Sequence, residues 1–69
     1  MQYNDTEKKK IFDEGMLTRS MVETEVALKK CQLYADMASD PSVKSLFKDQ
    51  AKGLEDALDF IRKGLSDLG

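Results

Sequence analysis

Mostly apolar residues recur at alternating three- and four-residue steps along two stretches of this chain. The first series comprises Met21, Thr24, Leu28, Cys31, Ala35 and Ala38. The second comprises Val43, Phe47, Gln50, Leu54, Ala57, Ile61, Gly64 or Leu65, and Leu68. Such steps place side chains on one face of an α-helix. The pattern therefore predicts two amphipathic helices, over residues 17–39 and 41–68.

The strongest break between the two series is Asp40-Pro41, which contains the only proline of the chain. Proline suits the first position of a helix, where its missing N–H needs no partner. Asp40 can cap the free N–H groups of that first turn. A connection this short forces the two helices to lie antiparallel and side by side. We therefore expect an all-α fold, an antiparallel two-helix hairpin that forms a single domain over residues 1–69.

The segment before the hairpin, residues 1–16, is expected to form a short N-terminal arm. Residues 6–14 can form a brief helix that is capped by Asp5 and closed by Gly15. The sequence Ser-Met-Val-Glu at residues 20–23 reads as a capping box near the start of the next helix. Ile11 and Phe12 would anchor the arm on the hairpin or on a neighbouring subunit. An unanchored arm with a frayed end is the alternative.

Both predicted helices carry more apolar residues than one hairpin can cover, because each has a second set outside its main stripe. These residues are Val22, Val26, Leu33, Tyr34 and Met37 in the first helix, and Leu46, Leu58 and Phe60 in the second. A second hairpin that completes a homodimeric four-helix bundle would cover them. The residues expected in the core and in self-association are Met21, Leu28, Cys31, Phe47, Leu54, Ala57, Ile61 and Leu65. Two alternatives are that residues 1–16 fold back over the surplus, or that an unidentified protein partner covers it.

Composition supports pairing and narrows the choice of partner. A chain of 69 residues is near the size at which a single core is marginal. Its one cysteine excludes a disulfide within the chain. With 11 basic and 13 acidic residues, no strong field favours nucleic acid. No apolar run is long enough to span a membrane, and the N-terminus does not resemble a signal peptide. A lone thiol then favours a cytoplasmic location.

Carboxylates that face the core of a helical bundle can hold metal ions, and Glu23, Glu25 and Glu55 are the candidates here. The usual companion ligand is a histidine three residues after a glutamate. Leu58 occupies that position after Glu55, and the chain contains no histidine.

Residues 33–38 (Leu-Tyr-Ala-Asp-Met-Ala) and 40–47 (Asp-Pro-Ser-Val-Lys-Ser-Leu-Phe) resemble the helical hairpin of ferritin-like, rubrerythrin-type proteins. They are also similar to the small spore-coat F-type two-helix proteins of spore-forming bacteria. The resemblance implies metal-ligand positions at Thr24, Leu54 and Ala57, none of which can bind iron. It therefore implies a hairpin whose metal site is not retained, in a bacterial and spore-associated protein.

The sequence thus predicts a non-catalytic oligomerisation or protein-interaction module without cofactors. Histidine, the commonest catalytic base, is absent, and two hairpins leave little room for a concave site. Cys31 is expected to be a buried core residue. The alternative function is a carboxylate metal-binding protein assembled from two half-bundles, with Glu23, Glu25 and Glu55 as ligands.

Overall fold

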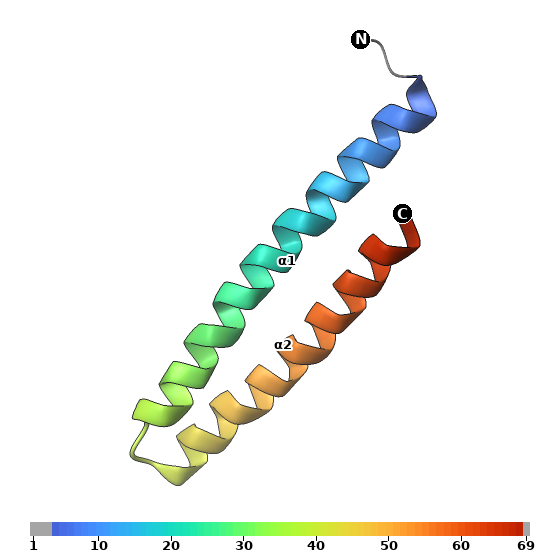
Figure 1. Ribbon diagram of the computed structural model, residues 1–69. Helices are drawn as coiled ribbons and strands as arrows, with labels where there is room; N and C mark the ends of the chain where they lie inside the picture. Colours follow the sequence, from blue (N-terminus) through green and yellow to red (C-terminus); the bar gives the residue numbers. More distant parts are fainter. Residues whose placement is uncertain (1–3, 69) are drawn as a thin grey trace.

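The computed structural model describes residues 4–68 and contains two α-helices, α1 (Asp5–Met37) and α2 (Pro41–Leu68). The helices run antiparallel and pack against each other along the length of α2 (Figure 1). The predicted all-α hairpin is therefore confirmed. The molecule is one helix thick, with extents of 56 × 18 × 12 Å.

The N-terminal arm is not a separate element, and this corrects the predicted boundary at residues 16 and 17. α1 begins at Asp5, and Asn4 rather than Asp5 is its N-cap: the Asn4 side chain accepts a 2.7 Å hydrogen bond from the Glu7 backbone N–H. Gly15 lies inside the helix, and no glycine among residues 4–68 adopts a positive φ. A glycine weakens a helix interior by about 1 kcal/mol but does not end it when good helix formers surround it. Residues 1–3 of the predicted arm lie outside the described residues.

The capping box predicted at residues 20–23, near the start of a helix, is also wrong. Residues 20–23 lie in the middle of α1, where the Thr24 hydroxyl donates a 2.7 Å hydrogen bond to the Ser20 carbonyl. The residues of the expected capping box therefore continue the helix. As a result, residues 5–16 do not fold back over the hairpin. The first turns of α1 instead project beyond the end of α2 (Figure 1). Ile11 and Phe12 in these turns are exposed.

The turn between the helices is held at both ends by side chains. α1 ends at Met37, two residues before the predicted end, and Lys44 donates a 2.7 Å hydrogen bond to the Ala35 carbonyl near that end. At the start of α2, both the backbone N–H and the hydroxyl of Ser42 donate to Asp40, at 2.8 and 2.6 Å. The predicted cap at Asp40 and the start of α2 at Pro41 are thus confirmed.

The Asp40 cap predicts an acid-sensitive contribution to stability. The hydrogen bonds from the Ser42 hydroxyl and backbone N–H lower the pKa of Asp40 below its ordinary value of 3.8. A carboxylate with a depressed folded pKa stabilises the fold fully above its unfolded pKa, and this contribution is lost as the pH falls through the folded pKa. Asparagine caps helices about as well but does not titrate. Chemical denaturation at pH 6 and pH 3 should therefore show a smaller acid loss of stability for Asp40→Asn than for the wild type. An equal loss in both proteins would contradict this role of the cap.

The core between the helices is small. The buried residues within the described range 4–68 are Cys31, Ala35, Ala51 and Leu58, of which only Leu58 is large. None of the described large side chains is fully buried. Along α2 the residues that face α1 follow the series Phe47, Ala51, Leu54, Leu58, Ile61 and Leu65, all buried or half-buried. The predicted stripe members Val43, Gln50 and Ala57 are exposed in the single chain, because they lie on one flank of this series.

Candidate interaction surface

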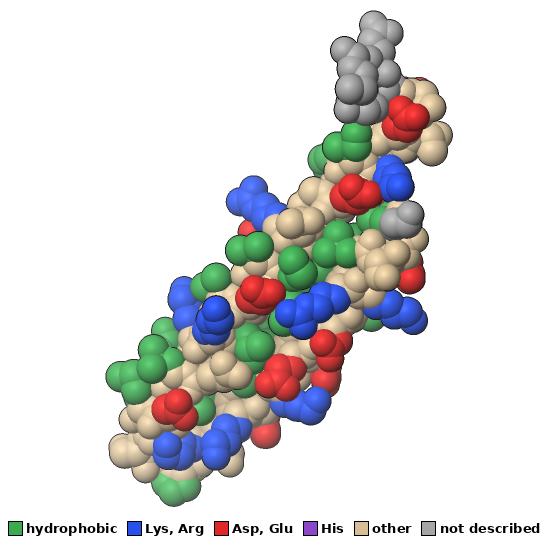
Figure 2. Space-filling view, viewed as in Figure 1, with side chains coloured by type: hydrophobic (Ala, Val, Ile, Leu, Met, Phe, Trp, Pro, Cys, Tyr) green, Lys and Arg blue, Asp and Glu red, His purple; other side chains and the backbone are tan. Residues whose placement is uncertain are grey.

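The α1 helix carries apolar side chains on the side that faces away from α2. Val22, Val26, Leu33 and Met37 are spaced by four, seven and four residues, which keeps them on one face. All four are exposed, and Met37 is 71% accessible. We call this set the outer edge of α1, and apolar side chains follow that edge of the molecule in Figure 2. The helix is therefore apolar on two opposite sides.

The α2 helix carries a second apolar set on one flank of the hairpin. Its members are spaced by four, three, four, three and four residues and include two glycines; they are Leu46, Gln50, Gly53, Ala57, Phe60 and Gly64. All but Gly64 are exposed, and Phe60 reaches 79% accessibility. Ten charged residues occur in α2, and none belongs to this set. We call it the uncharged flank of α2.

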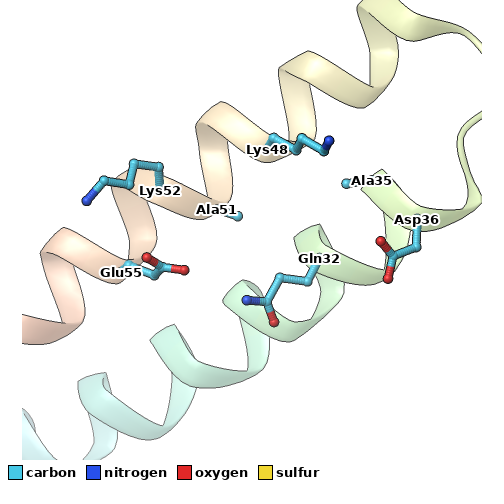
Figure 3. A pocket seen from close by; sticks show the side chains of 7 residues that line it. All are labelled: Gln32, Ala35, Asp36, Lys48, Ala51, Lys52 and Glu55. Atoms are coloured by element: carbon cyan, nitrogen blue, oxygen red, sulfur yellow. The ribbon is translucent and has the colours of Figure 1, made fainter.

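The opposite face of the hairpin is polar. A shallow groove there is lined by Ala35 and Ala51 at its base and by five polar or charged residues around it: Gln32, Asp36, Lys48, Lys52 and Glu55 (Figure 3). Further along the same face, Arg62 of α2 pairs with Glu25 of α1 at 3.4 Å. The hydrogen bond from Lys52 to Asp56, 2.8 Å long, raises the pKa of Lys52. The two flanks of α2 thus differ strongly in charge.

Most of the residues predicted for the core and for self-association lie at the seam between the helices. Cys31 is buried as a free thiol, whereas Ala57 is exposed on the uncharged flank. The others are half-buried: Met21, Leu28, Phe47, Leu54, Ile61 and Leu65. Sequence reasoning missed Ala51 and placed Leu58 outside the main stripe, although both are buried against α1. Their signal was present, because Ala51 and Leu58 continue the three- and four-residue spacing from Phe47 and Leu54.

The three glutamates considered as metal ligands are not brought together in the chain. Glu23 pairs with Arg19 at 3.0 Å, Glu25 pairs with Arg62, and Glu55 borders the polar groove. Across residues 4–68 there is no group of three histidine, cysteine, aspartate or glutamate residues that could hold a metal ion. At the positions that the resemblance implies for ligands, Thr24 uses its hydroxyl within α1, and Leu54 and Ala57 are apolar.

Neither described helix has a stretch that is both long and apolar enough to cross a membrane. Comparison of the chain with protein-family models, with curated proteins and with solved structures found no match. The resemblance to ferritin-like and spore-coat hairpins therefore stays a prediction from the sequence.

Proposed function

We propose that this chain is a non-catalytic self-association module, which pairs with a second copy to form a four-helix bundle and thereby presents a protein-interaction surface. The observation that carries the proposal is the mismatch between a minimal core and a large exposed apolar surface. One large and three small side chains are buried, whereas eleven large apolar side chains of the described residues are exposed. Exposed apolar patches on this scale mark interaction surfaces.

Energetics support the same proposal. A domain of this size hides a smaller fraction of its surface on folding than larger domains do, and a hairpin one helix thick hides less than a compact domain does. Each large side chain that becomes fully buried adds about 1.5–3 kcal/mol. Covering Leu46, Phe60 and their neighbours with a second hairpin would therefore add to the stability that the present core provides.

The chemistry of the chain supports a binding role rather than an enzymatic one. It contains no histidine, and its glutamates at the candidate positions are paired or solvent-facing. The likeness of residues 33–47 to spore-associated hairpins, together with the single free thiol, supports a bacterial cytoplasmic or spore setting. That part of the proposal rests on the sequence alone.

Sedimentation equilibrium of the full chain tests the proposal. We expect a species of twice the 7.8 kDa chain mass over the micromolar range. A helical monomer at every concentration would contradict self-association. A chain that sediments as a monomer and is unfolded would point instead to a different protein as the partner that covers the apolar surface.

A further inference from the structure

We infer that the second copy packs antiparallel on the uncharged flank of α2 and the adjoining side of α1, with a two-fold axis that passes near Gly53 and Ala27. This inference rests on the proposed self-association. It adds which face of the hairpin is covered, the relative direction of the two chains, and the residues that lie at the two-fold axis. It places the turns of the two hairpins at opposite ends of the bundle.

The distribution of charge selects the face. The uncharged flank has no ionisable residue over its six positions, whereas the opposite face of the hairpin contains Lys48, Lys52 and Glu55. The apolar residues of α2 therefore extend beyond the side that meets α1 and continue around the helix onto the uncharged flank. Met16 and Ser20 of α1 lie on the same side, because they line one shallow depression together with Gly64 and Leu68. The exposed Asp13 is the one charged residue that also lines it. A desolvated interface fits this face and does not fit the other.

The pattern along α2 is self-complementary about Gly53. Leu46 lies seven residues before Gly53, and Phe60 lies seven residues after it. In an antiparallel pair centred there, Leu46 of one chain meets Phe60 of the other, and Gln50 lies beside Ala57 of the second copy. A two-fold interface requires such a self-complementary surface.

Gly53 itself is best explained by a close neighbour outside the chain. A Cβ atom added at Gly53 would meet nothing within 4 Å, so the hairpin alone gives no reason for a glycine. Glycine in a helix interior costs about 1 kcal/mol relative to alanine. At the crossing point of two helices, however, it permits the closest backbone approach.

The α1 helix also carries a small residue at the level of Gly53 along the hairpin. The tilted rings of Tyr34 and Phe47 lie 5.2 Å apart between their centroids, and Leu17 lies 3.6 Å from a Cβ placed on Gly64. The residue numbers of each pair add up to 81, so residue 28 lies level with Gly53. The small Ala27 is its neighbour on the side of the uncharged flank.

Charges on α1 agree with an antiparallel copy centred near Ala27. Glu23 precedes Ala27 by four residues, and Lys30 follows it by three. Both are exposed, and the two-fold operation brings Glu23 of one chain next to Lys30 of the other. The arrangement thus gives two opposite-charge pairs at the rim of the apolar contact.

The outer edge of α1 is a less suitable contact surface for a second copy. Its centre lies between Val26 and Leu33, where the chain carries the consecutive exposed lysines Lys29 and Lys30. A two-fold axis there would bring these lysines next to the same two lysines of the other chain, and like charges repel.

The proposed face is large enough for a stable interface. A helix of 28 residues is about 42 Å long, and with a width of 18 Å the face offers roughly 750 Å² per chain. This area is close to the ~800 Å² per partner of stable interfaces.

A matched pair of charge substitutions tests the face. Gln50→Glu and Gln32→Glu are the same change at exposed helix positions, the first on the uncharged flank and the second beside the polar groove. We expect Gln50→Glu to raise the dimer dissociation constant about tenfold or more by burying a charge, and Gln32→Glu to leave it within about twofold. Equal effects of the two substitutions would overturn the choice of face.

Cysteine cross-linking tests the axis. In a Cys31→Ala background, Gly53→Cys should form a covalent dimer upon mild oxidation, because a residue on a two-fold axis meets its own copy within disulfide reach. Ser45→Cys, on the same helix away from the flank, should not do so at equal concentration. A chain that is dimeric by sedimentation but not cross-linked through position 53 would overturn the axis while leaving self-association intact. A monomeric wild type would overturn the proposed function itself.

Discussion

A Leu58→Asp chain is expected to lose most of its helical circular dichroism signal at 25 °C. Among residues 4–68, Leu58 is the only large side chain of the four that are buried, and it is 5% accessible. Truncation of a buried leucine to alanine alone costs about 2–5 kcal/mol. A carboxylate at the same place adds the cost of an unpaired buried charge. Because small domains have little stability to lose, this one change should unfold the chain.

The matched control is Leu33→Asp, the same substitution at an exposed position on the outer edge of α1. This variant should stay helical and should pair as the wild type does, because Leu33 lies on the side of α1 that faces away from α2. Should Leu58→Asp remain as helical as Leu33→Asp, the seam between α1 and α2 would be assigned to the wrong residues.

The unfolding temperature is expected to rise with protein concentration. When folding is coupled to pairing, each tenfold increase in concentration stabilises the folded dimer by about 1.4 kcal/mol. With an unfolding entropy of about 2.1 cal/mol/K per residue over two chains, this corresponds to a shift of about 5 °C for each tenfold step. Thermal melts followed by circular dichroism over a hundredfold concentration range measure the shift.

The Leu33→Asp variant should show the same concentration dependence, because the proposed contact does not include the outer edge of α1. A melting temperature that stays constant over the whole range would mean that the hairpin folds without a partner. The exposed apolar side chains would then need another explanation.

The hairpin itself was predictable because local chemistry determines its turn. Pro41 fixes the first residue of α2, Asp40 caps it, and the connection is too short for any arrangement except an antiparallel pair. The start of α2 at Pro41 agrees with the prediction for the same reason.

The start of α1 was not predictable from the same kind of signal. Gly15 and the residues from Ser20 to Glu23 form plausible helix ends when they are read alone. Both lie within a continuous run of residues that form helices well, and no proline interrupts that run. Interior glycines and serines weaken a helix without breaking it. Whether the helix continues through them therefore depends on the helix propensities summed over many residues.

The face of α2 that meets α1 was also ambiguous. From Phe47, a series through Gln50 and Ala57 and a series through Ala51 and Leu58 satisfy the helical period equally well. The choice between them is a rotation of the helix about its axis, which the packing against α1 decides. The series that does not pack against α1 leads onto the uncharged flank. This is why we propose that the second copy of the chain packs there.

Native mass spectrometry of mixed isotopic chains tests the central claim, that the chain pairs with a second copy, most directly. Natural-abundance and ¹⁵N-labelled chains are unfolded together in equal amounts, refolded and transferred with any bound metal retained. We predict three dimer masses in a ratio of about 1:2:1 with no additional mass, as random pairing of identical chains requires. Monomer masses alone would contradict self-association, and dimers that carry the added mass of metal ions would contradict the non-catalytic interpretation and favour the glutamate site.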